Sequence, residues 1–336
     1  MAIPKLEVPD GLNEEYYQIN PDILGSFNKY RPPLNLFLFK EDVARVTSYF
    51  KVGGRLTNEQ IEDLAKLVEQ GLVFVSREDH PIYVKHISYQ LDLVLVDKNL
   101  KEKEIADIFV QALTRRMRDF MDQPVPLVRE KLWTDLMVLT EYLFTDIHRV
   151  RALVKRLHQT HTLENHAVNC GFVGLAVYGR ARKQEFEERT IKRTTFDRLA
   201  AGLFLHDMGM TKIPAFIREK DKPLVPDERA KIQGHTRLGY EMLAKLDLKF
   251  PEIEQCVQDH HERLNGSGYP QKKSDKELGE YARLCALTDS FCAMVVKRPY
   301  AEAMDMLKAA GTLGQDPGYD QRLSGMLQAL VLDIKK

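Results

Sequence analysis

The stretch Ala200-Ala-Gly-Leu-Phe-Leu-His-Asp-Met-Gly209 joins a very apolar run to two neighbouring ionisable side chains, His206 and Asp207. The run begins at Leu199 and predicts a buried helix. Two ionisable groups at the end of such a helix cost free energy unless a partner compensates, and metal coordination is one such partner. The stretch therefore predicts a metal site inside a helical domain.

Further candidate ligands lie on both sides of this pair, because eight of the ten histidines fall between residues 148 and 261. Each residue alone is more typical of a packed core or of the surface, but their order along several predicted helices favours a metal site. Neighbouring helical residues point roughly 100° apart, so an adjacent pair can reach two ions. A carboxylate can bridge two ions, which makes Asp207 the natural central ligand. Imidazole and carboxylate together suit Fe, Mn or Zn better than Ca or Mg alone. The candidates are His166, His206, Asp207, His235, His260, His261 and Asp289.

The chain as a whole predicts a mainly α-helical protein of two domains, since 336 residues are long for one compact domain. Residues 1–120 predict a smaller α/β or α+β module with a regulatory or sensor role. A long connecting helix is expected in residues 121–157, after two prolines that mark the boundary, and a helical catalytic domain in residues 158–336. Within the module, strands are expected at 34–39 and 72–76 and a helix at 58–70.

The overall composition argues against several classes of partner. Lys+Arg and Asp+Glu balance at 49 each, so no overall charge attracts duplex nucleic acid or an anionic membrane. We see no signal-peptide pattern and no stretch near the roughly 18 apolar residues of a membrane span. The four cysteines lack Cys-x-x-Cys spacing and are expected as buried free thiols in a reducing compartment. These features predict a cytoplasmic protein.

The motifs resemble those of the HD phosphohydrolase superfamily. The opening stretch, followed by Ile213-Pro214 and by His235 with Gly239, is similar to the superfamily pattern. The segment His260-His-Glu-Arg-Leu-Asn-Gly-Ser-Gly-Tyr-Pro270 is similar to the extended signature of the HD-GYP branch. Leu287-Thr-Asp-Ser-Phe-Cys-Ala293 and Lys297-Arg-Pro-Tyr300 also match in order and spacing, so that the resemblance covers roughly residues 155–332.

The resemblance implies a phosphodiesterase that hydrolyses cyclic di-GMP to pGpG, often onward to GMP, with two or three Fe or Mn ions. By position, the seven candidates would be the metal ligands, Asp207 would bridge, and a metal-activated water would attack the phosphorus. Three-metal members carry a glutamate four residues before the first histidine, where this chain has Thr162, so two divalent ions are expected. His158 and His161 are expected either at the surface or beside the ligands.

The resemblance also implies substrate contacts. Gly266 and Gly268 allow a tight turn close to a ligand. Tyr269, expected in a substrate-binding and catalytic role, would present its phenol or ring face to guanine or phosphate, with packing on the core as the alternative. Arg298 matches a phosphate-binding arginine of the family, with a solvated helix-end charge as the alternative. Where the family commonly has a phosphate-contacting lysine, this chain has Met210, and Lys212 is the expected substitute, in a substrate-binding and catalytic role.

Three functions therefore remain open at this point. The first is a cyclic di-GMP phosphodiesterase controlled by its N-terminal module. The second is a weak or inactive sensor that binds the dinucleotide and signals to a protein partner, which the loss of the lysine at Met210 favours and the complete ligand set opposes. The third is an HD hydrolase of another cyclic dinucleotide or of pGpG. A homodimer through the long helix is a further expectation.

Overall fold

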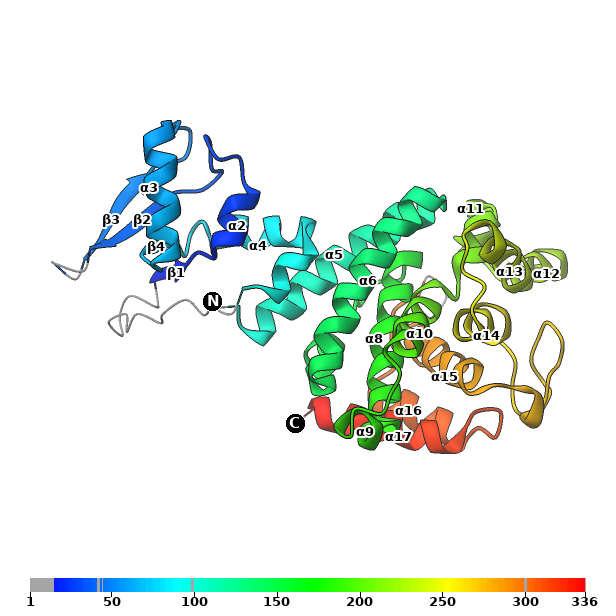
Figure 1. Cartoon of the computed structure of the whole chain (residues 1–336). Helices are drawn as coiled ribbons and strands as arrows, with labels where there is room; N and C mark the ends of the chain where they lie inside the picture. The colour runs from blue at the N-terminus through cyan, green and yellow to red at the C-terminus, as the bar shows by residue number, and fades with distance from the viewer. Residues whose placement is uncertain (1–14, 41–42, 44, 98–99, 299–300, 336) are drawn as a thin grey trace. The chain divides into compact units, whose positions relative to one another are not determined.

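The computed structural model describes residues 15–40, 43, 45–97, 100–298 and 301–335. The chain forms two compact units, residues 1–109 and 110–336. Their division falls inside helix α5 (Glu102–Asp122), ahead of the prolines that the sequence suggested as a boundary. The fold is mainly helical with one small antiparallel sheet, as the sequence predicts (Figure 1).

The N-terminal unit is built on a four-stranded sheet with the order β1-β4-β2-β3. The helix expected at 58–70 begins after the N-cap Thr57. The Thr57 hydroxyl accepts the Gln60 N–H at 3.2 Å, and the Gln60 side chain accepts the Thr57 N–H at 2.9 Å. The two expected strands are present, and β1 and β3 join them. The elements are β1 (Tyr16–Gln18), α2 (Pro21–Ser26), β2 (Leu36–Lys40), β3 (Arg45–Phe50), α3 (Asn58–Glu69), β4 (Val73–Ser76), α4 (His80–Tyr89) and the 3-10 helix η1 (Leu91–Leu95).

The long helix expected within residues 121–157 is interrupted. Helix α6 (Pro126–Thr145) ends before Asp146, whose backbone is extended at φ −154° and ψ 103°. The Asp146 carboxylate accepts the His148 N–H at 2.9 Å and so starts a new turn, η2 (Ile147–Arg149), followed by α7 (Val150–Val154). The expectation of one continuous helix is therefore wrong, because an Asx turn at Asp146 competes with helix continuation.

Helix α8 (Leu163–Ala181) is the central element of the C-terminal unit and is buried from Asn165 to Gly179. It packs against α7, α10, α15 and α17. A side chain at Gly171 would place its Cβ 2.0 Å from the Phe204 ring of α10, so the glycine permits the close approach of the two helices. The other elements are α9 (Lys183–Glu187), α10 (Arg193–Leu205), η3 (Met208–Lys212), α11 (Ala215–Arg218), α12 (Pro226–Gln233), α13 (His235–Lys245), α14 (Pro251–Asp259), η4 (Asp275–Glu277), α15 (Glu280–Met294), α16 (Met306–Gln315) and α17 (Gln321–Lys335).

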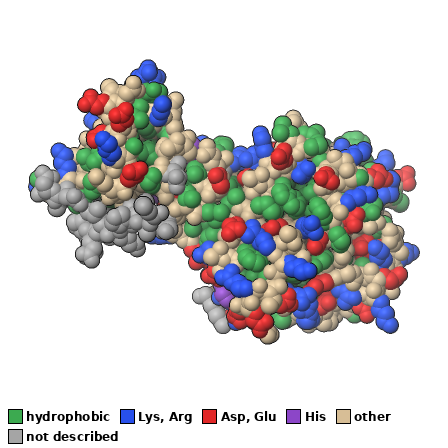
Figure 2. All heavy atoms as spheres, viewed as in Figure 1, with side chains coloured by type: hydrophobic (Ala, Val, Ile, Leu, Met, Phe, Trp, Pro, Cys, Tyr) green, Lys and Arg blue, Asp and Glu red, His purple; other side chains and the backbone are tan. Residues whose placement is uncertain are grey.

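The surface of the C-terminal unit carries mixed charge. On the face in view, acidic and basic side chains are interspersed rather than gathered by sign (Figure 2), in keeping with the equal numbers of acidic and basic residues. Among the residues that the structure describes, no helix combines the length and the apolar character that crossing a membrane requires.

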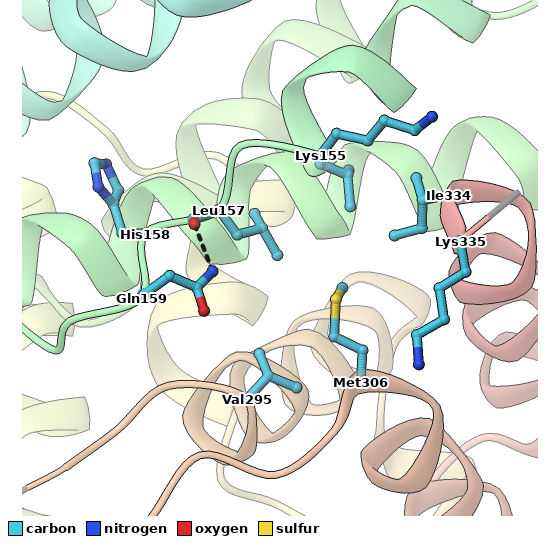
Figure 3. A pocket seen from close by; sticks show the side chains of 9 residues that line it. Lys155, Leu157, His158, Gln159, Val295, Met306, Ile334 and Lys335 are labelled. Carbon is cyan, nitrogen blue, oxygen red and sulfur yellow. Dashed lines mark hydrogen bonds between the residues drawn. The ribbon is translucent and has the colours of Figure 1, made fainter.

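A cavity of about 200 Å³ lies beside the segment that joins α7 to α8 (Figure 3). Leu157, Gln159, Val295 and Ile334 are among its lining residues, and the Gln159 amide donates to the Leu157 carbonyl at 2.9 Å. None of the seven candidate metal ligands lines this cavity. The metal centre is therefore a separate feature of the unit.

Candidate metal centre

All seven candidate ligands converge in the C-terminal unit, in two neighbouring groups. In each group, one ligand atom from every residue lies within 4.8 Å of the others. The structure thus brings together residues that span more than 120 positions of the chain. The first group is His166, Cys170, His206 and Asp289, and the second is Asp207, His235, His260 and His261.

Most ligands stand at the ends of helices. His166 lies in the first turns of α8, whose N-cap Thr162 accepts the Asn165 N–H. His206 and Asp207 follow α10, and Asp289 projects from within α15. His235 begins α13, and the pair His260 and His261 follows α14. Five separate segments therefore meet at one point, which explains why the order of histidines along the chain, rather than any single motif, signals the site.

Asp207 faces both groups. Its Oδ2 lies 3.8 Å from Nε2 of His166 and 3.7 Å from Nε2 of His206, which belong to the first group. Its Oδ1 lies 3.1 Å from Nε2 of His235 and 3.5 Å from Nε2 of His260, which belong to the second. One carboxylate oxygen is thus directed to each group, as a bridging ligand requires.

The backbone fixes the orientation of three imidazoles. Nδ1 of His206, His235 and His260 lies 2.9, 2.6 and 2.8 Å from a backbone carbonyl oxygen of the preceding turn. A carbonyl only accepts, so each Nδ1 donates, and the lone pair of a neutral ring stands on Nε2. These Nε2 atoms all point toward Asp207. The backbone carbonyls therefore select the tautomer that a metal ion needs.

Two features of the lone pairs fit the binding of a cation. Nε2 of His206 is buried and has no hydrogen-bond partner. Nε2 of His235 and Nε2 of His260 lie only 3.1 Å apart, although both rings already donate through Nδ1. Two facing lone pairs repel unless a cation or a proton lies between them. The donor set therefore fits divalent metal ions.

The protonation states of four candidate ligands also suit metal binding. At His235, burial lowers the pKa, but the hydrogen bond to Asp207 and the charge of its carboxylate, with smaller effects, outweigh burial, so that this pKa lies above its usual value. Burial lowers the pKa of His206 to about 4. Burial and the neighbouring His260 hold the pKa of His261 well below its usual value. Burial opposes ionisation of the two aspartates, but the surrounding imidazoles hold the pKa of Asp207 and of Asp289 below the usual range. Neutral imidazoles and ionised carboxylates are the ligating forms.

The glycine turn lies against the second group. The ring of Tyr269 stacks on that of His261, with centroids 4.7 Å apart. Gly266 has φ +74°, and a Cβ at Gly268 would lie 2.5 Å from Cα of Glu262. The sequence interpretation overlooked Glu262, a buried carboxylate that accepts the N–H of Gln271 at 2.6 Å and of Lys273 at 3.0 Å and so holds the turn in place.

Two predicted phosphate contacts have different settings. Lys212 ends η3 and is exposed. The charge of Arg298 acts on His161: burial first, and then this guanidinium, lower the pKa of His161 to about 4. His161 in turn lies against His166, with ring centroids 5.7 Å apart, so the charge of Arg298 acts on a neighbour of the first group. Contact of either residue with a substrate stays a prediction.

His158 and His161, which were expected either at the surface or beside the ligands, have different surroundings. His161 contacts a ligand ring, whereas His158 turns to α5, where its Nε2 lies 2.7 Å from the Thr114 hydroxyl. All four cysteines are buried and free, as expected. The sequence interpretation left Cys170 out of the metal site, although its spacing of four residues from His166 places both on one helix face.

Comparison with known proteins identifies a matching family model and several similar enzymes. The family model described as HD domain matches residues 182–323. Over 103 residues the chain is 38% identical to the cyclic di-GMP phosphodiesterase response regulator RpfG of Xanthomonas campestris. The aligned region covers 30% of this chain and 27% of that protein. It is 36% identical over 97 residues to a cyclic di-GMP phosphodiesterase of Thermotoga maritima, and this alignment covers 29% of this chain and 26% of the relative. It is 30% identical over 118 residues to the 3'3'-cGAMP-specific phosphodiesterase 3 of Vibrio cholerae, and this alignment covers 35% of this chain and 25% of the relative.

These alignments span only about a quarter of the curated relatives' length. A solved structure, Bd1817, described as an HDG"Y"P protein from Bdellovibrio bacteriovorus, matches with a TM-score of 0.61 at 14% identity and covers 94% of this chain and 99% of that one. It supports the fold. Residues 182–323 of the helical unit thus match the HD domain family, and the curated relatives that the chain resembles are named cyclic di-GMP or 3'3'-cGAMP phosphodiesterases.

Proposed function

We propose that this protein is a metal-dependent phosphodiesterase that hydrolyses cyclic di-GMP to pGpG. The observation that carries the proposal is the position of Asp207, with one oxygen directed to each of two ligand groups. The names of the relatives from Xanthomonas campestris and Thermotoga maritima support this choice of substrate. The N-terminal unit would then regulate the C-terminal one.

The side chains have separate tasks in this proposal. Two divalent ions, which we propose to be Fe or Mn, would supply positive charge and lower the pKa of a water at the site. The seven ligands and the backbone carbonyls behind them hold the centre in one geometry. Tyr269 would offer a ring face to a guanine base, and Arg298 and Lys212 would bind phosphate oxygens. Asp207 stays ionised because imidazoles surround it.

A second substrate has support of its own. Three relatives from Vibrio cholerae are named 3'3'-cGAMP-specific phosphodiesterases, at 30–32% identity. The two dinucleotides differ in one base, so the phosphodiester chemistry is the same and only the base contacts distinguish them. Both substrates therefore belong in the first assay.

The test is product analysis after anaerobic loading with Fe(II) or Mn(II). Wild type, Asp207→Ala and the control Asp333→Asn are each mixed with cyclic di-GMP or with 3'3'-cGAMP. We expect linear product from wild type and from the control, in which a distant α17 carboxylate changes, and none from Asp207→Ala. Full turnover by Asp207→Ala would contradict the mechanism. Dinucleotide that binds to the metal-loaded wild type but stays intact would favour a sensor and make Met210 the first suspect.

A further inference from the structure

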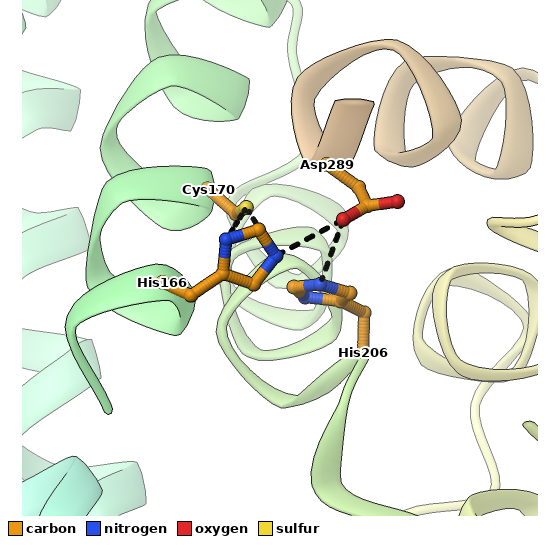
Figure 4. A group of neighbouring side chains, drawn as sticks. All are labelled: His166, Cys170, His206 and Asp289. Carbon is orange, nitrogen blue, oxygen red and sulfur yellow. Dashed lines mark hydrogen bonds and ion pairs between the residues drawn. The ribbon is translucent and has the colours of Figure 1, made fainter. Parts of the chain in front are cut away.

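Cys170 lies inside the first ligand group although no sequence motif pointed to it. It stands one turn after His166 on α8 and is completely buried. Its Sγ is 3.5 Å from Nε2 of His166, while that same nitrogen is 3.0 Å from Oδ1 of Asp289 (Figure 4). Ligands of one ion, each about 2.0–2.3 Å from the metal, lie at comparable distances from one another.

A second observation points into the same space. Nε2 of His206 is buried, accepts no hydrogen bond, and lies 3.9 Å from Oδ1 of Asp289. In Figure 4, the rings of His166 and His206 both turn toward Asp289, with Cys170 beside His166. One atom from each of two imidazoles, one carboxylate and one thiol therefore lies within 4.8 Å of the others, and the four residues come from three helical segments.

The thiol already has neighbours within hydrogen-bonding distance of a sulfur. Its Sγ lies 3.5 Å from Nε2 and 3.9 Å from Nδ1 of His166, and 3.9 Å from the Thr288 carbonyl oxygen. A bound cation is what would remove the thiol proton.

We propose that Cys170 is a thiolate ligand of the ion held by His166, His206 and Asp289. The inference rests on the metal dependence proposed above and extends it. On binding, the metal–sulfur bond forms, the S–H bond breaks, and the proton leaves to solvent, with no change of oxidation state. With the Asp207 oxygen that is directed to this group, the donor set is one sulfur, two nitrogens and two oxygens, and its sulfur favours Fe(II), Co(II), Zn(II) or Cd(II) over Mn(II) or Mg(II).

The two halves of the centre then differ in metal preference. The second group offers three imidazoles and the Asp207 carboxylate, with no sulfur among its four members. It accepts Mn(II) as readily as other borderline cations. The first group is the half that selects the softer ion, so a protein loaded from a mixture would hold two different metals.

The measurement is anaerobic titration of the chelator-treated full chain with Co(II), followed by absorption spectroscopy. A cobalt–thiolate bond gives an intense charge-transfer band in the near ultraviolet, which oxygen and nitrogen ligands lack. We expect the band in wild type and in Cys292→Ala, whose cysteine is equally buried beside Cys170 but outside the ligand group. It should be absent from Cys170→Ala and from the nearly isosteric Cys170→Ser, which keeps the fold if the alanine variant does not.

Competition between Cd(II) and Mn(II) provides a second readout. Loss of groups that only support a ligand costs about 10–100-fold in metal affinity, so loss of a ligand itself should lower Cd(II) affinity at least about 10-fold. Mn(II) affinity should change less. Wild type that binds Co(II) without the near-ultraviolet band would overturn the thiolate ligand and leave the metal-dependent function standing. Wild type that binds no Co(II), Fe(II) or Mn(II) would overturn both.

Discussion

Asp207 shows at the residue scale how one side chain can organise a centre built from five segments. Its two oxygens divide between the ligand groups, and its position follows from local packing. A Cβ at Gly209, two residues further on, would lie 1.9 Å from the His235 carbonyl oxygen. The glycine therefore lets η3 approach the start of α13 closely enough for Asp207 to reach His235.

Replacing Asp207 with asparagine removes the charge and keeps the shape. An amide is a much weaker ligand for divalent cations than a carboxylate. We expect Asp207→Asn to retain less metal than wild type after gel filtration, with both ions affected, as measured by elemental analysis. Retention of the full metal content would show that Asp207 does not bridge.

Glu262 is a second residue with a specific consequence. Its buried carboxylate accepts two backbone N–H groups of the segment after the glycine turn. Glu262→Gln should lower the free energy of unfolding by about 1–3 kcal/mol, because an amide places a donor against a backbone donor. Glu277→Gln is the matched control: Glu277 also accepts a backbone N–H, from Ser274, but is exposed. Equal effects in urea denaturation would contradict the role of burial.

His161 gives the apo protein a pH dependence of defined sign. Its pKa in the folded state is about 4, below the usual 6.5, chiefly because of burial. Between these values the unfolded chain binds a proton that the folded protein does not, so stability is complete above about pH 6.5 and falls toward pH 4. His161→Asn should flatten this part of the profile, measured by urea denaturation of chelator-treated protein. His148→Asn, which removes an exposed histidine, controls for loss of an imidazole.

At the scale of elements, the contact between α8 and α10 determines the distance between His166 and His206. Both helices carry a ligand at one end, and Gly171 allows them to pack closely. Sequence patterns predicted the buried helix before His206 because its apolar run is long. They did not predict the end of α6 at Thr145, since the turn at Asp146 depends on one side chain that also fits a helix surface.

Gly171→Ala should disturb this contact. The added methyl group would overlap the Phe204 ring, and overpacking of this kind costs about 1–3 kcal/mol. Thermal unfolding of the apo protein measures the loss. Gly311→Ala on α16 is the control, because no atom lies within 4 Å of the position that its new Cβ would take and alanine favours helices by up to about 1 kcal/mol. A stabilised Gly171→Ala would mean that α8 and α10 can move apart freely.

At the scale of the whole molecule, the seven candidate ligands all lie between residues 166 and 289, inside the C-terminal unit. The sequence predicted both classes of domain, and it grouped these seven residues because the histidines are concentrated in the helical part; their binding of metal stays a prediction. It missed β1, which has three residues, and β3, where Arg45 and Ser48 interrupt the apolar pattern. It also missed Cys170, because an apolar helix gives a buried cysteine no distinguishing neighbours.

The C-terminal unit should therefore bind metal without the N-terminal one. The fragment must keep α5, because Thr114 contacts His158 and Arg118 pairs with Glu164 at 3.1 Å. We expect residues 102–336 to retain the same number of ions per chain as the full protein by elemental analysis. A fragment that folds, by circular dichroism, and yet binds fewer ions would place part of the centre's support in residues 1–101.

The sharing of Asp207 between two groups has a consequence for loading. Two ions that draw on one carboxylate cannot bind as independent events, because the first to arrive orients the oxygen that the second needs and also repels it by charge. Orientation makes successive binding cooperative and repulsion makes it anticooperative, so the balance sets whether half-loaded protein accumulates. Cooperative binding would make the fraction of centres that hold both ions rise steeply above a threshold metal concentration in the cell. Anticooperative binding would make that fraction rise gradually with the metal concentration.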